Sequence, residues 1–203
     1  MDRSNNNSKG LLIMSIEENS ELSHIAFAVL GLVSEYPCHG KDINERIEKR
    51  GMRSWTAIGK SSIYSVLKNL KRDELVESWM EEENNRLVKI YKITNKGTKF
   101  LKNKIYKILN EYIGRNDPDF YMAFSMLPIL SEEEQIEVFS NSLKTIEKHK
   151  LGLEEMLGEN SKTPLNVRGL FIHPIKILNT DIEFLEYVLD VIRSGGGSID
   201  PKT

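Results

Sequence analysis

The chain has 203 residues, 39% of them hydrophobic and 29% charged, which is typical of a globular protein with one or two domains. It has no run of about 18 apolar residues that could cross a membrane, no N-terminal signal sequence and a single cysteine, Cys38, so a cytoplasmic location is expected. The net charge of −2 hides a basic middle, because residues 41–107 carry 17 Lys and Arg against 9 Asp and Glu, and this excess suits a polyanion unless it only forms a solvated face.

Residues 1–20 are rich in Asn, Ser and Glu, and we expect them to form a flexible N-terminal arm. After this arm, apolar residues recur every three or four positions and predict a buried helix that ends before Pro37. A second amphipathic helix is predicted over residues 41–50. Trp55 lies in the connector that follows and is expected to pin the turn before the third helix.

The rest of the chain is organised around the stretch from Gly59 to Ile93. Its first half predicts a short amphipathic helix, because Ile63, Leu67 and Leu70 share one face while hydroxyls and cations occupy the other. Two β-rich runs then flank an acidic, Asn-rich turn, which predicts a hairpin. Helix, turn, helix and hairpin are the plan of a winged helix-turn-helix domain, placed at residues 21–113. In that fold the third helix enters the major groove of DNA, and the hairpin reaches phosphate or a minor groove.

The candidate DNA contacts are cations, hydroxyls and one tyrosine on the outward faces of these elements. They are Lys41, Lys60, Ser61, Ser62, Tyr64, Lys68, Arg86 and Lys89. Arg86 and Lys89 are the better candidates for phosphate contact, because a charge near a hairpin tip has little structural role. Tyr64 could instead be a partly buried residue that only braces its helix.

A basic helix with Thr94 or Asn95 as its N-cap follows the hairpin, and the helical pattern then breaks. We place a second domain beyond this break, at residues 118–193. It begins with a short apolar helix, and Ser131 with Glu134 forms a capping box for the next helix.

Two long heptad stripes dominate the second domain and need partners. Because a two-helix hairpin makes a thin core, we expect a dimer with a second copy, although packing within one chain is the alternative. The predicted dimerisation residues are Ile136, Phe139, Leu143, Ile146, Leu178, Ile182, Leu185, Leu189 and Ile192. Pro174 is expected in the first turn of the last helix, with Phe171 just upstream. Residues 194–203 are predicted to form a flexible tail.

Aromatic residues gather where the two predicted domains meet. They are Tyr106, Tyr112, Phe120, Tyr121 and Phe124. Such a cluster could line a cavity for a small effector, or it could be ordinary core.

The sequence does not indicate an enzyme. The four histidines are scattered without metal-ligand spacing, and Cys38 has no motif that would activate its thiol. Nothing resembles a phosphate-binding glycine loop. No metal or cofactor is therefore expected.

Three segments resemble the PadR family of transcriptional regulators, which are cytoplasmic winged-helix dimers. They are "AFAVLGLVSEYPCHGKDI" for the first helix and turn, "SSIYSVLKNLKRDELV" for the recognition helix, and "KIYKITNKG" for the second hairpin strand and the next helix start. Together they cover roughly residues 26–97. The chain departs from the family at Lys41, where an aromatic residue is usual, and at Ser65, where proline is usual. The resemblance implies C-terminal dimerisation and repression of nearby genes, often relieved by a small molecule.

The sequence thus predicts a mainly α-helical chain with a small β-hairpin wing, made of a winged helix-turn-helix domain and a C-terminal helical dimerisation domain. The predicted function is a homodimeric, sequence-specific DNA-binding regulator of transcription, a repressor relieved by a small aromatic or apolar effector. A winged-helix protein-interaction module within a larger assembly is the alternative, and binding to duplex DNA would separate the two.

Overall fold

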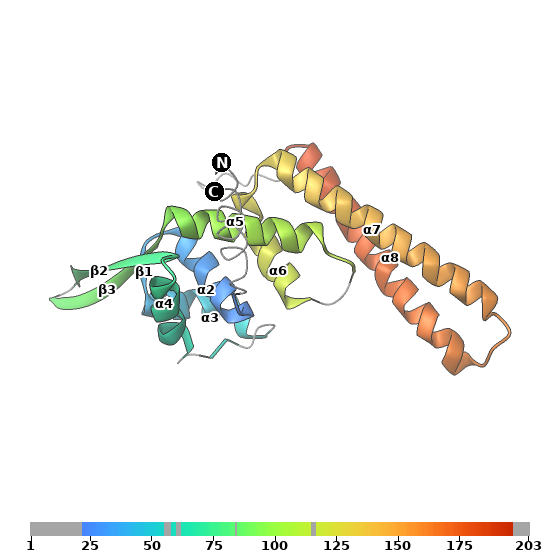
Figure 1. Cartoon of the computed structure of the whole chain (residues 1–203), viewed down its shortest axis with the longest axis horizontal. Coiled ribbons are helices and arrows are strands. Elements are labelled where there is room, and N and C mark those ends of the chain that lie inside the picture. Colours follow the sequence, from blue (N-terminus) through green and yellow to red (C-terminus); the bar gives the residue numbers. More distant parts are fainter. Residues whose placement is uncertain (1–21, 55–57, 60–61, 84, 115–116, 197–203) are drawn as a thin grey trace, which may run out of the picture.

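A computed structural model describes residues 22–54, 58–59, 62–83, 85–114 and 117–196 (Figure 1). The fold is mainly helical, as predicted, with one three-stranded antiparallel sheet. The elements in chain order are α2 (His24–Glu35), β1 (Cys38–His39), α3 (Gly40–Lys49), η1 (Met52–Ser54), α4 (Ser62–Arg72), β2 (Val76–Glu83), β3 (Arg86–Ile93), α5 (Asn95–Asn110), α6 (Pro118–Ser125), η2 (Leu127–Ile129), α7 (Glu132–Glu159) and α8 (Leu165–Arg193). The predicted N-terminal arm, most of the predicted tail, Trp55, Lys60 and Ser61 lie outside the described residues.

The N-terminal part is a helix-turn-helix unit that carries a long hairpin. Phe27 of α2, Ile43 of α3 and Ile63 of α4 are completely buried, so the three helices share one core. β2 and β3 pair along their whole length, and the two-residue strand β1 adds to the free edge of β3 in the order β1-β3-β2. Sequence analysis expected only a turn at β1, because two residues are too few to show an alternating pattern.

Two predicted helix starts are confirmed. The Thr94 hydroxyl accepts a hydrogen bond from the backbone N–H of Gly97 at 2.9 Å, so Thr94 is the N-cap of α5. Ser131 and Glu134 form the capping box of α7. Because Thr94 directly follows β3, the end of the wing is fixed to the start of α5.

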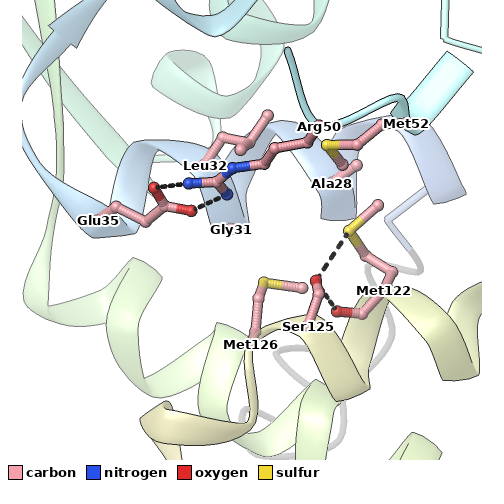
Figure 2. Close-up of a pocket in the computed structure, with 9 residues that line it drawn as sticks. All are labelled: Ala28, Gly31, Leu32, Glu35, Arg50, Met52, Met122, Ser125 and Met126. Carbon is pink, nitrogen blue, oxygen red and sulfur yellow. Dashed lines mark hydrogen bonds and ion pairs between the residues drawn. The ribbon is translucent and has the colours of Figure 1, made fainter. Parts of the chain in front are cut away.

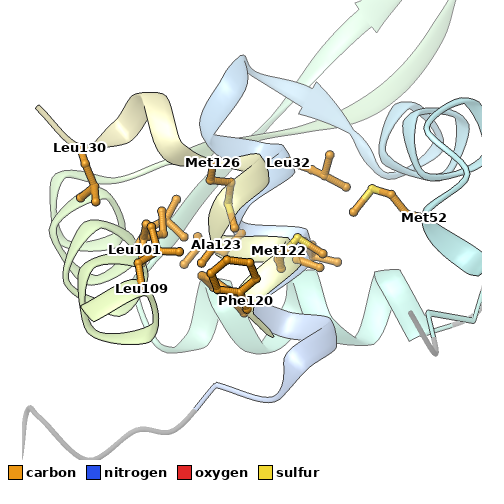
Figure 3. Packing of buried hydrophobic residues seen from close by; sticks show 14 of the residues in the cluster. Leu32, Met52, Leu101, Leu109, Phe120, Met122, Ala123, Met126 and Leu130 are labelled. Atoms are coloured by element: carbon orange, nitrogen blue, oxygen red, sulfur yellow. The ribbon is translucent and has the colours of Figure 1, made fainter. Parts of the chain in front are cut away.

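The hydrophobic core runs without a break from the winged part into the C-terminal part. Leu101 and Leu109 on the inner face of α5 pack in one cluster with Phe120 and Met122 of α6 (Figure 3). α6 also approaches α2 closely at Gly31, where an added Cβ would overlap the Met126 sulfur. α6 is therefore held between the winged helix-turn-helix unit and the long C-terminal helices.

α7 and α8 form an antiparallel hairpin that projects away from the rest of the molecule (Figure 1). With 28 and 29 residues they are each about 42 Å long, at about 1.5 Å per residue. Phe139 and Ile146 of α7 and Leu185 of α8 are completely buried. The two heptad stripes therefore pack to a large extent against residues of the same chain.

The predicted start of the last helix is wrong. α8 begins at Leu165 after the N-cap Pro164, so Phe171 and Pro174 both lie inside it. An interior proline cannot donate to the carbonyl four residues earlier and costs about 3 kcal/mol in a helix. The packing of α8 against α7 offsets this cost.

Candidate nucleic-acid interface

The outer face of α4 is the centre of the candidate interface. The inner residues Ile63, Leu67 and Leu70 are at most 1% exposed and fix the helix against the core. On the opposite face Tyr64 is 55% exposed, and the exposed Lys68 lies one turn further along. α4 thus presents a phenol and an ammonium group side by side, which are groups that can contact base edges and phosphates in a major groove.

Two other predicted contact residues, Ser62 at the start of α4 and Lys41 of α3, already have partners. The Ser62 hydroxyl donates to a backbone carbonyl of the preceding turn at 2.7 Å. Lys41, near the start of α3, has its Nζ 3.5 Å from the Glu45 carboxylate, and both side chains are exposed. Such surface pairs contribute little, so Lys41 can exchange this carboxylate for a phosphate. Lys71 was not among the predicted contacts, and its ammonium donates to the Ser78 hydroxyl of β2 at 2.9 Å, which ties α4 to the wing.

The wing brings carboxylates next to its cations. Its two strands hold four glutamates against three cations. The cross-strand pairs of the cations are Arg86 with Glu83, Lys89 with Met80 and Lys92 with Glu77. Residues that pair across a sheet lie on the same face, so the Glu83 side chain lies on the same face of the wing as Arg86.

The wing tip is acidic as well as basic. Glu81, Glu82 and Glu83 are all exposed, and they belong to β2, although sequence analysis assigned this segment to the turn. Glu83 Oε2 also lies 3.6 Å from Nε2 of His39. The sequence showed these glutamates, but only the strand register shows that Glu83 stands opposite Arg86. The wing therefore both attracts and repels a phosphate backbone.

The predicted effector residues mostly form a closed aromatic cluster. The rings of Tyr112 and Phe120 stack with centroids 3.9 Å apart, and Phe124 continues the cluster toward Phe139 of α7. The Tyr112 hydroxyl donates to the Asp181 carboxylate at 3.2 Å, and burial together with this negative charge raises the pKa of Tyr112. Tyr106 is half-buried and Tyr121 is half exposed at the edge of the cluster.

A cavity lies elsewhere, between α2, α6 and the segment after α3 (Figure 2). Its volume is about 190 Å³. The lining residues are Ala28, Gly31, Leu32, Glu35, Arg50, Met52, Met122, Ser125 and Met126. Most of this wall is apolar, and three methionine side chains contribute to it (Figure 2). Sequence analysis missed the cavity because its walls come from three segments that are distant in the sequence.

One edge of the cavity is an ion pair. The two guanidinium nitrogens of Arg50 lie 2.5 and 2.8 Å from the two carboxylate oxygens of Glu35 (Figure 2). Arg46 adds a further contact to the same carboxylate at 3.1 Å. Burial works to raise the pKa of Glu35, but the hydrogen bonds and charges of Arg50 and Arg46 outweigh it and lower this pKa. Glu35 is therefore held as a carboxylate.

The predicted dimerisation residues are largely covered within one chain. Those that are buried are Phe139, Ile146, Leu178, Leu185, Leu189 and Ile192, and those that are half-buried are Ile136, Leu143 and Ile182. A different set on α8 stays exposed, namely Leu170 at 70%, Ile177 at 41% and Phe184 at 38%. These three residues recur every seven positions. The sequence did not single them out, because the longer buried stripe on the same helix is more regular.

Metal-binding clusters and membrane-spanning helices are absent from the described residues. In the described part of the chain, no three His, Cys, Asp or Glu side chains are grouped so that they could hold a metal ion. None of the helices described is long and apolar enough to span a bilayer.

The helix-turn-helix unit with its hairpin defines a winged helix-turn-helix domain. Residues 29–103 match the model of the transcriptional regulator PadR-like family. The family is one of transcription regulators and not of enzymes, in agreement with the prediction from sequence.

Similar solved structures have low TM-scores, so the assignment depends on the family match. They include Bacillus subtilis PadR in complex with operator DNA, with 19% identity, 84% of this chain and 99% of that chain covered, and a TM-score of 0.41. A PadR family transcription regulator from Clostridium difficile R20291 is 20% identical; the match covers 42% of this chain and 88% of that chain, with a TM-score of 0.38. The protein smu.1704 from Streptococcus mutans UA159 is 26% identical; the match covers 45% of this chain and 88% of that chain, with a TM-score of 0.35. No curated protein matches the chain.

Proposed function

We propose that this protein is a homodimeric, sequence-specific DNA-binding regulator of transcription that acts in the cytoplasm as a repressor. The match of residues 29–103 to the PadR-like family carries this proposal, because that segment contains all of α3, α4 and the wing. In a winged helix the third helix enters the major groove, and the hairpin reaches the backbone or a minor groove. The exposed Tyr64 and Lys68 on the outer face of α4 support the same docking.

A mobility-shift titration tests the DNA-binding function. The full chain is titrated against the duplex upstream of its own coding region and against a shuffled duplex of the same composition. The proposal requires the upstream duplex to shift at lower protein concentration, with an affinity that falls as salt rises because cations on the protein release counterions from DNA. Failure to shift either duplex at low salt would end the proposal.

The second copy is proposed to dock on the exposed stripe of α8. Leu170, Ile177 and Phe184 have the spacing of a helix-pair seam, and contiguous exposed apolar residues of this kind mark interaction surfaces. A two-fold dimer would present two α4 helices to successive turns of a duplex. The residues 118–193 would then form the dimerisation domain, with a different face in use from the one expected from the sequence.

A small apolar effector is proposed to bind in the cavity between α2 and α6. Its 190 Å³ is similar to the roughly 150 Å³ apolar cavity that takes up benzene in another protein. Methionine side chains adapt readily to aromatic rings. α2 belongs to the winged domain, and α6 leads into the long hairpin of α7 and α8. A ligand between α2 and α6 would therefore shift the winged domain relative to the long hairpin.

Thermal-shift measurements with phenol and indole test the cavity. Either compound should raise the melting midpoint of the wild-type chain, and the cavity-filling variant Ala28→Leu should lose that response. No response from the wild-type chain to either compound would count against an effector of one or two rings in this cavity.

A winged-helix protein-interaction module is the second candidate, and the acidic wing tip favours it. Glu81, Glu82 and Glu83 would repel phosphate but suit a basic protein surface. The mobility-shift titration separates the two functions, because an interaction module would leave both duplexes unshifted.

A further inference from the structure

Gly40 and Tyr64 lie on different helices and meet at the interface. Gly40 is the first residue of α3, and Tyr64 stands on the outer face of α4. A Cβ added to Gly40 would lie 2.6 Å from Cε1 of the Tyr64 ring and 3.2 Å from its Cζ. Carbon atoms in contact keep about 3.5–4.0 Å apart. Any other residue at position 40 would therefore displace this ring.

The backbone does not require a glycine at position 40. The glycines with positive φ among the described residues are Gly51, Gly114 and Gly195. Gly40 begins a regular helix after the N-cap His39, and the helical backbone at this position would accept alanine as readily as glycine. The need for glycine at this position thus comes from the Tyr64 ring and not from the conformation of the chain.

The wing lies close to α4, because the Lys71 ammonium of α4 donates to the Ser78 hydroxyl of β2. Tyr91 of β3 is 7% exposed, and its pKa is raised by burial and, to a smaller degree, by the neighbouring Tyr64. The Nζ of Lys89 lies 5.6 Å from the centroid of the Tyr91 ring. Tyr64 is therefore placed where the start of α3, the outer face of α4 and the base of the wing come together.

We propose that Gly40 is a positioning residue for DNA recognition, which leaves the Tyr64 ring the room it needs to direct its hydroxyl from α4 into the major groove. The inference rests on the proposed DNA-binding function. Because Tyr64 is 55% exposed, its ring is not a core residue, and its hydroxyl can donate to or accept from a base edge. A displaced ring would still leave α4 folded, but it would no longer meet the same base.

Four chains test this inference: wild type, Gly40→Ala, Tyr64→Ala and the double variant. The affinity of each is measured for the upstream duplex and for the shuffled duplex, together with its melting midpoint. Gly40→Ala should weaken binding to the upstream duplex about tenfold, with little change for the shuffled one, because a base contact carries sequence information and a phosphate contact does not. In the Tyr64→Ala background, Gly40→Ala should have no further effect on affinity.

Several outcomes would overturn the inference. One is an unchanged affinity of Gly40→Ala for the upstream duplex, and another is an equal loss in both backgrounds. A Gly40→Ala chain whose melting midpoint collapses, and recovers in the double variant, would assign the contact to stability and not to recognition. The wild-type titration keeps the two proposals apart, since a wild-type chain that binds no duplex refutes the DNA-binding function itself.

Discussion

Removing the three carboxylates at the wing tip should tighten DNA binding. The variant carries Glu81→Gln, Glu82→Gln and Glu83→Gln, which keep the size of each exposed side chain and remove its charge. The structure motivates it because Glu83 pairs with Arg86 across the strands. The wing cations then act on phosphate without carboxylates beside them.

The size of the effect follows from the strand register. Paired side chains have Cβ atoms about 5 Å apart, so a phosphate held by Arg86 lies about 6 Å from the Glu83 carboxylate. Two like charges at that distance repel by about 0.7 kcal/mol in water, and screening at physiological salt roughly halves this value. This leaves about 0.35 kcal/mol for Glu83, while Glu81 and Glu82, which pair with Val88 and Leu87 and lie further from Arg86, add about 0.1 kcal/mol each. The three carboxylates together cost about 0.6 kcal/mol, so their removal should tighten binding about two- to threefold.

Fluorescence anisotropy with the upstream and the shuffled duplex measures this change. The gain should be similar on both, because phosphate contacts carry no sequence information. The matched control changes three exposed glutamates of α7, Glu147, Glu155 and Glu159, to glutamine, which alters the net charge equally but far from α4. Unchanged affinity of the wing variant, or an equal gain in the control, would refute the reasoning and show that the wing tip stays away from DNA.

Further predictions concern the stability and the assembly of the chain. Pro174→Ala restores a backbone donor inside α8 and should raise the free energy of unfolding in urea by about 1–3 kcal/mol; a loss would mean that α7 and α8 pack around the proline. Because the pKa of Glu35 is lower in the folded chain than its ordinary 4.5, the ionised carboxylate stabilises the fold above that value and this contribution is lost as pH falls through the folded pKa. Wild type should therefore lose stability toward acid more steeply than Glu35→Gln, and parallel curves would contradict this. Ile177→Asp should convert a dimer into a folded monomer by light scattering while Glu183→Gln leaves it a dimer, and a dimer that survives Ile177→Asp excludes the α8 stripe.

The parts of the fold set by local pattern could be predicted from the sequence. α4 followed from apolar residues at helical spacing, and the caps Thr94 and Ser131 followed from side chains that satisfy the first N–H groups of a helix. The interior position of Pro174 could not be predicted, because packing along α7 outweighs the local preference of proline for a helix start.

The parts of the candidate site set by tertiary contacts could not be predicted. A heptad stripe has the same pattern whether its partner is the same chain or another, so the burial of Leu185 within one chain was not visible in the sequence. The pairing of Glu83 with Arg86 depends on the strand register, and a shift of one residue would place them on opposite faces. The contact of Gly40 with Tyr64 joins two helices and leaves no periodic signal.

The outer face of α4 is proposed to meet DNA, and charge reversal at Lys68 tests this contact most directly. Lys68→Glu and the control Lys148→Glu, on an exposed site of α7, are compared with wild type in anisotropy titrations on the upstream duplex over a range of salt. Lys68→Glu should weaken binding about tenfold or more and reduce the slope of log affinity against log salt by at least about 1, while Lys148→Glu should bind as wild type does. Equal affinities and equal slopes for all three chains would contradict the account.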